Sequence, residues 1–148
     1  MQTWRNAALI EIRNIVADLS PAYFAMVMAT GIVSLSAQML GMPRLAAALF
    51  ALNAVAYVTI WALYLLRIWW FGRVVLGDLT DHQRGPGFFT TVAASGILGS
   101  QFVLIAGNYH VAAVLWVLAI VLWVSLIYTI LTAFTIKEDK PGLYEGIS

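Results

Sequence analysis

Residues 21–32 read PAYFAMVMATGI, and residues 86–97 read PGFFTTVAASGI. At this offset of 65 residues, six of the twelve positions are identical and three more are chemically similar. The two stretches share a leading proline, an aromatic pair and a Thr/Ser-Gly-Ile step. Two unrelated apolar helices would rarely share all three features in one register. The chain therefore contains an internal repeat, a feature that is common in membrane transport proteins.

The composition around this repeat is that of a membrane protein. Of the 148 residues, 62% are hydrophobic and only 10% are charged, whereas about a quarter of the residues in soluble domains are charged. A helix needs roughly 20 apolar residues to cross a bilayer, and four stretches qualify. They cover residues 22–40, 45–68, 88–106 and 111–136, and none contains an acidic residue. The predicted fold class is an all-α membrane protein with four transmembrane helices.

The connections at residues 41–44 and 107–110 are very short, so the four helices should form two antiparallel hairpins. The first hairpin repeat covers residues 20–84, including a cytoplasmic loop, and the second covers residues 85–136. Residues 137–148 form a tail. Seven of the eight basic residues fall on one side of the membrane, which the positive-inside rule assigns to the cytoplasm. They are Arg5, Arg13, Arg67, Arg73, Arg84, Lys137 and Lys140, whereas Arg44 falls on the other side. Both termini are therefore expected in the cytoplasm, with the protein in the plasma or inner membrane.

The N-terminal segment, residues 1–19, is not a typical cleaved signal, because charged residues interrupt its apolar run. Its apolar and polar residues fall on different helical faces, which predicts an amphipathic helix at the membrane surface. An ordinary exposed helix before the first span is the alternative. The apolar face holds Ala8, Ile12, Ile15 and Leu19, and the polar face holds Glu11, Asn14 and Asp18.

The two helices of each hairpin differ in composition. The first and third helices are rich in small and polar residues, whereas the second and fourth are rich in bulky apolar ones. Lipid accepts bulky apolar side chains, while small and polar residues favour helix contacts or a wet cavity. The first and third helices are therefore predicted to be inner, and the other two outer. Candidate pore-lining residues are Tyr23, Thr30, Ser34, Gln38, Phe88, Thr91, Ser95, Gly99 and Phe102. The alternative, which is compatible with lining, is that the small residues permit close helix packing.

Pro21 and Pro86 start the two inner helices at the cytoplasmic end. A helix N-terminus carries a partial positive charge, so several such ends around one axis would favour anions. The alternative is that each proline only starts its helix, where proline is well suited.

Other chemistry is sparse. The chain has no cysteine, which excludes disulfides, thiolate metal sites and a cysteine nucleophile. Asp78, Asp81 and His82 are close in sequence and could be read as metal ligands, but a hydrated loop is the preferred interpretation. Asn53 is expected to form an interhelical hydrogen bond. No catalytic set is found, and the net charge of +1 gives no reason to expect nucleic-acid binding. The chain is therefore predicted to be neither an enzyme nor a metal- or cofactor-binding protein.

The stretches SPAYFAMVMATGIVSL (20–35) and HQRGPGFFTTVAASGILGSQF (82–102) resemble the tellurite-resistance and C4-dicarboxylate transporter family. This family includes plant slow anion channels, fungal malate permeases and sulfite exporters. The resemblance implies a fold of ten helices in five hairpins around a quasi-fivefold axis, with odd helices lining a pore. The chain would correspond to the N-terminal two hairpins, about two fifths of that fold, which suggests truncation at a repeat boundary. The gating phenylalanine of the family lies on a later helix, so no gate residue is assigned.

The expected function is transmembrane movement of small anions such as malate, sulfite, tellurite-related or inorganic anions. Such a pathway needs weak, distributed attraction so that ions enter and leave. A proton-coupled carrier is the rival, but it usually requires an ionisable residue within the membrane, and the four spans have none at their centres. A truncated fragment that conducts nothing alone is the alternative from another class. Besides lipid and small anions, the expected partner is either further copies of the chain or a separately encoded C-terminal part.

Overall fold

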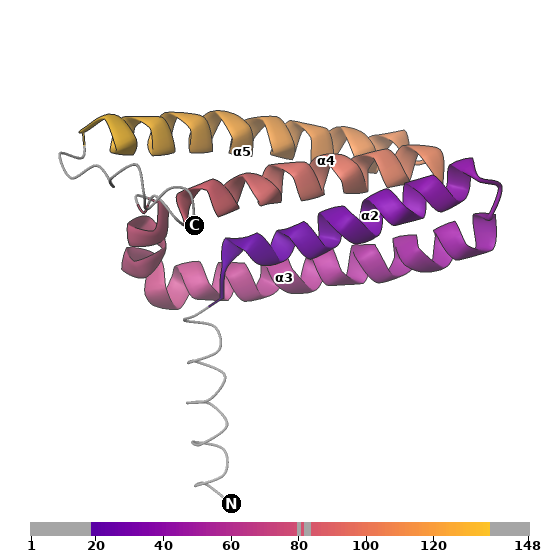
Figure 1. The fold of residues 1–148 in the computed structure, drawn as a ribbon, viewed down its shortest axis with the longest axis horizontal. Helices are drawn as coiled ribbons and strands as arrows, with labels where there is room; N and C mark the ends of the chain where they lie inside the picture. The colour runs from indigo at the N-terminus through magenta and orange to yellow at the C-terminus, as the bar shows by residue number, and fades with distance from the viewer. Residues whose placement is uncertain (1–18, 80, 82–83, 137–148) are drawn as a thin grey trace, which may run out of the picture.

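The computed structural model describes residues 19–79, 81 and 84–136, and this part of the chain is helical without strands (Figure 1). The predicted amphipathic face and the C-terminal tail thus lie outside the described residues, apart from Leu19. The elements are the 3₁₀ helix η1 (Pro21–Tyr23), α2 (Phe24–Met39), α3 (Pro43–Leu79), the 3₁₀ helix η2 (Gly85–Phe88), α4 (Phe89–Leu104) and α5 (Tyr109–Ile136). The four α-helices, two of them extended by their 3₁₀ turns, are long and apolar enough to cross a membrane. The predicted fold class is confirmed.

The internal repeat is visible in the backbone. Both ends of α4 lie 65 residues after the corresponding ends of α2, and each helix follows a proline-containing 3₁₀ turn. Each hairpin then turns at a glycine with positive φ, Gly41 (76°) and Gly107 (65°). At the first turn the amide of Met42 donates to the carbonyl of Ala37 (2.9 Å), as expected for a glycine-capped helix end. The same sequence unit therefore produces the same local structure twice.

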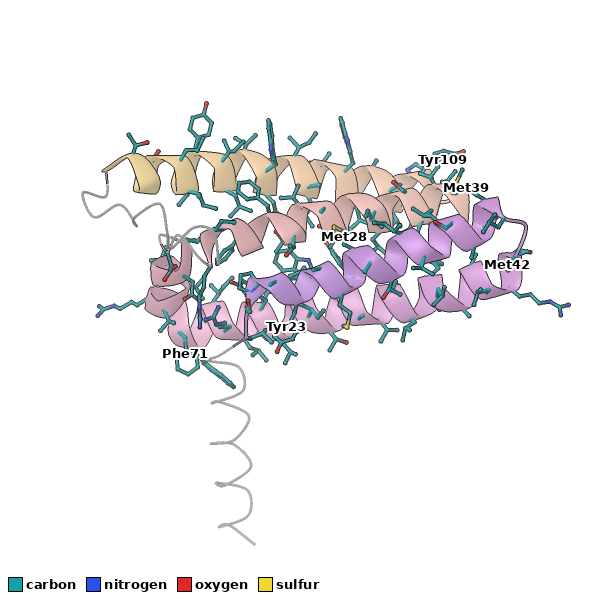
Figure 2. All side chains as sticks on the ribbon, in the orientation of Figure 1. Tyr23, Met28, Met39, Met42, Phe71 and Tyr109 are labelled. Atoms are coloured by element: carbon teal, nitrogen blue, oxygen red, sulfur yellow. The ribbon has the colours of Figure 1, made fainter. Side chains whose placement is uncertain are left out.

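The helices lie in the order α3, α2, α4, α5 (Figure 1). The main packing is α2 on α3, α2 on α4, and α4 on α5. The two hairpin turns are at one end of the bundle, where Figure 2 shows Met39, Met42 and Tyr109, while Tyr23 and Phe71 lie toward the other end. The predicted division into two inner and two outer helices is thus present in the structure.

Helix α3 is longer than the second span predicted from the sequence. The second span was expected to end at residue 68, but α3 continues to Leu79. It does so through a kink at Phe71, whose φ of −132° and ψ of 34° are not helical. The part after the kink turns away from the long segment (Figure 1), and charged residues expected in a loop are therefore helical.

An aromatic cluster holds the first hairpin together. Phe24 is fully buried at its centre and meets the rings of Tyr57, Trp61 and Tyr64 edge-on, with centroids 5.3–6.2 Å apart. Edge-to-face pairs of this kind add to the stabilisation that comes from apolar burial. The aromatic residue after Pro21 thereby anchors α2 on α3.

Candidate functional site

Polar side chains of the inner helices meet at the junction of α2, α3 and α4. The Ser34 hydroxyl donates to the Ala46 carbonyl (2.8 Å), and the hydroxyls of Tyr57 and Ser95 are 2.7 Å apart. Polar groups at membrane depth need partners inside the protein, because lipid offers none. These contacts therefore join each inner helix to α3.

A buried amide pair lies at the same junction. Asn53 Nδ2 donates to Gln101 Oε1 over 2.6 Å, and both side chains are fully buried. This confirms the interhelical hydrogen bond expected of Asn53. Its partner was not identified from the sequence, because the polar residues of the third span are spread around its circumference and 48 positions separate the pair.

Five of the nine predicted pore-lining residues are packed against their neighbours. Ser34, Thr91 and Ser95 have almost no accessible surface, and Gly99 lies against the α5 backbone, with the Ala112 carbonyl 3.6 Å from its would-be Cβ. Phe88 is buried beside the Tyr64 ring. In this arrangement the structure supports the packing alternative at these positions. Their exposure to a pore remains a prediction about a larger assembly.

The other four candidates retain accessible surface. Tyr23 is exposed, and Thr30, Gln38 and Phe102 are partly buried. Gln38 Oε1 is buried without a partner among the described residues, and the Phe102 ring packs on Phe50 with centroids 4.9 Å apart. The structure thus does not bring the nine residues together on one surface.

The starts of the two inner helices lie together. Thr90 Oγ1 donates to the carbonyl of Pro21 (2.9 Å) and is also within 2.6 Å of the carbonyl of Gly87. Ser20 Oγ accepts from the amide of Ala22 (3.3 Å). These contacts show that Pro21 is part of a capped helix start. Anion attraction by the helix ends stays a prediction.

A buried ion pair at the end of α3 corrects one expectation from the sequence. Asp78 does not lie in a hydrated loop, because its carboxylate is largely buried and meets Arg67 at 2.6 Å. Arg84 approaches the other carboxylate oxygen at 3.3 Å, and the Arg67 guanidinium lies 5.9 Å from the Tyr64 ring centroid. His82, which was considered with Asp78 as a metal ligand, lies outside the described residues. The kink at Phe71 brings Asp78 back to Arg67, and no proline in the sequence marks that kink.

These features define a multi-pass membrane protein built from repeated helical hairpins whose inner helices carry no ionisable residue. A family model described as "SLAC1: Voltage-dependent anion channel" matches residues 18–138. The chain belongs to this family, as the resemblance in its sequence indicated, and membership supports anion transport in general. Neither a comparison with curated proteins nor one with solved structures gave a match.

Proposed function

We propose that this chain forms part of a pathway for small anions, in the class of C4-dicarboxylates, sulfite, tellurite-related and inorganic anions. The observation that carries the proposal is the match to the anion-channel family over residues 18–138. The inner helices are compatible with this role, because α2 and α4 contain hydroxyls, amides and glycines but no charged side chain. Such walls attract an anion weakly enough to release it.

Gln38 is the candidate that favours an anion most directly. It lies in the last turn of α2 and is partly buried. Its amide NH₂ group can donate to an anion, as an uncharged group suited to passage should. We therefore place Gln38 at the wall of the pathway, with Thr30 and Tyr23 on the same helix.

Efflux from liposomes tests the proposal. Vesicles loaded with chloride, nitrate, malate or sulfite and containing the purified chain should release these anions faster than protein-free vesicles, with little release of potassium or sucrose. Gln38→Leu should lower anion efflux severalfold. Val117→Ala is the matched control, because Val117 is exposed on the outer helix α5, and it should leave efflux unchanged. Equal release of anions and sucrose would contradict an anion pathway.

The alternative function is a structural one without conduction. It is favoured by the packing of the described helices, whose main contacts run from α3 through α2 and α4 to α5 and so form an open row. No efflux from chains that circular dichroism shows to be helical would support this alternative, provided that efflux also fails at high protein density.

A further inference from the structure

No described side chain fills a groove between α4 and α5, although side chains fill its counterpart in the first hairpin. The groove encloses about 490 Å³ and contains Gly96 and Ser100 of α4 and Trp116 of α5. A Cβ atom placed at Gly96 would meet no atom within 4 Å, apart from its chain neighbours and the backbone of its own helix. The groove is thus lined by small residues on one side and an aromatic on the other, and we call it the socket.

The repeat shows what occupies the equivalent place in the first hairpin. Gly31 is the counterpart of Gly96, and a Cβ atom at Gly31 would collide with the side chain of Ile97. It would also lie 3.3 Å from Gln101 Oε1. The inner helix of the second hairpin therefore inserts an aliphatic side chain at the glycine of the first hairpin.

The outer helices show the same difference. At an offset of 66 residues, Phe50 corresponds to Trp116, and Tyr57 corresponds to Trp123. The offset follows from the turn glycines and places Ala112 opposite Gly99 as Ala46 is opposite Ser34. Phe50 packs on Phe102, and the Tyr57 hydroxyl contacts Ser95, so both are engaged by α4.

Their counterparts on α5 are open. The Trp116 side chain is 64% exposed and Trp123 is 48% exposed. Both lie on the face of α5 that corresponds to the face of α3 in contact with α4. Among the described residues, therefore, no inner helix packs on α5 in the way that α4 packs beside α3.

The chain also carries an unused copy of the inserting face. On α4 this face includes Ile97, Leu98 and Gln101, and the last two are buried. The equivalent residues on α2 are Ile32, Val33 and Ser36, and all three are exposed, Ile32 by 48% and Val33 by 56%. One chain thus presents both an empty socket and a free face of the kind that fills it.

We propose that the socket binds α2 of a second copy of this chain, with Ile32 entering at Gly96 as Ile97 enters at Gly31. The contact joins two different surfaces, so copies would associate head to tail. Gly96 and Ser100 favour a protein partner, because small residues let helices approach closely and gain packing that lipid chains do not provide.

Disulfide cross-linking tests this contact directly. The chain has no native cysteine, so introduced pairs are unique. Ile32→Cys and Gly96→Cys are placed on two differently tagged chains, mixed in liposomes at low protein density and oxidised. The Ile97 contact at Gly31 indicates that the equivalent Cβ atoms meet the short spacing that a disulfide needs. We expect a cross-linked product that carries both tags.

Two further cysteine pairs serve as the positive and the negative control. Gly31→Cys and Ile97→Cys in one chain should form an intrachain disulfide, because that contact is present in the structure. Val55→Cys, exposed on α3, mixed with Gly96→Cys should give only background product. A further experiment omits the cross-linking. In it, Gly96→Trp, which fills the socket, should abolish co-purification of the two tags.

The proposal is overturned if the Ile32–Gly96 pair cross-links no more than the Val55–Gly96 pair, which would leave the socket to lipid or another protein. It is also overturned if the Gly31–Ile97 pair fails, because the repeat argument rests on that contact. Cross-linking is read without measuring transport, so its outcome is independent of whether the chain conducts anions.

Discussion

The glycines at one repeat position, Gly31 and Gly96, have different surroundings and should respond differently to the same change. Gly31→Ala must displace the Ile97 side chain and approach Asn53 Nδ2, which lies 2.9 Å from the added carbon. We expect a loss of about 1–3 kcal/mol in the free energy of unfolding, as for overpacked cores. Gly96→Ala adds a methyl group in open space and should be neutral or stabilising by about 0.5–1 kcal/mol through helix propensity.

Reversible unfolding by SDS in mixed micelles, followed by the far-ultraviolet helix signal, measures both values. Equal effects of the two substitutions would show that α4 does not press on α2 at Gly31.

The buried amide pair should show a measurable coupling. Asn53→Leu and Gln101→Leu each leave one amide without its partner, whereas the double variant removes both. Hydrogen bonds between membrane helices contribute on average about 0.6 kcal/mol and at most about 1.7 kcal/mol in double-mutant cycles, and we expect a coupling in this range. Thr59→Val is the control, because the Thr59 hydroxyl bonds only within its own helix, to the Val55 carbonyl at 2.8 Å. A coupling of zero would contradict the contact.

At the scale of residues, the sequence indicated which side chains are polar but not which groups they contact. The hydrogen bond of Asn53 was predictable because an amide inside a membrane span needs a partner. Ser34 and Ser95 fit pore lining and packing equally well by helical phase alone. The contacts that their hydroxyls make with Ala46 and Tyr57 depend on the placement of α3 and show packing within this arrangement, while pore lining in a larger assembly stays a prediction.

At the scale of elements, the end of α3 depends on a charge pair that the sequence did not reveal. The apolar pattern predicted a span that ends near Arg67, and the charges beyond it are typical of a loop. Arg67 and Asp78 are eleven residues apart, which would be too far along a straight helix for their side chains to meet. The kink at Phe71 joins them, and no proline marks it.

Loss of that pair should destabilise the end of α3. Asp78→Asn removes the carboxylate that the fully buried Arg67 meets at 2.6 Å, and breaking a buried pair costs about 3–5 kcal/mol. Asp81→Asn should cost little, because Asp81 is exposed and substitutions at the surface usually change stability by no more than about 0.5 kcal/mol. Thermal unfolding in detergent compares the two variants, and a restored midpoint in Arg67→Met/Asp78→Leu would agree with a buried pair. Equal midpoints of the two single variants would exclude a structural role for the pair.

The orientation of the hairpins is a second prediction at this scale. Met42 and Tyr109 lie at the same end of the bundle (Figure 2), and the excess of basic residues at the other end predicts that Met42 and Tyr109 face away from the cytoplasm. Reporter fusions after either residue should therefore be active outside. A fusion at Asp81 should be active in the cytoplasm, and it leaves the Arg67–Asp78 pair intact. A cytoplasmic signal at Tyr109 would contradict the orientation.

For the whole molecule, the repeat was the most informative signal, because matched positions in two copies predict matched structure. It predicted two hairpins with their small-residue helices inside, and the described helices pack with α2 between α3 and α4. It could not predict which small residues face a neighbour. Gly31 and Gly96 have similar sequence neighbours, ATGIV and ASGIL, and the side chains of α3 and α4 around Gly31 distinguish their surroundings.

The open arrangement of the described helices leads to an expectation about how transport depends on protein density. The principal helix contacts form a row from α3 to α5, so the described residues of one copy do not form a closed wall around an anion path. If copies assemble through the socket, the initial rate of anion efflux should rise more steeply than linearly with protein density in liposomes. Gly96→Trp should remove this steep rise, whereas Val117→Ala, on the exposed face of α5, should keep it. Stopped-flow efflux over a wide range of protein-to-lipid ratios measures the exponent. Linear dependence with an unchanged rate in Gly96→Trp would mean that a single chain conducts, because a path formed between copies cannot survive when their contact is blocked.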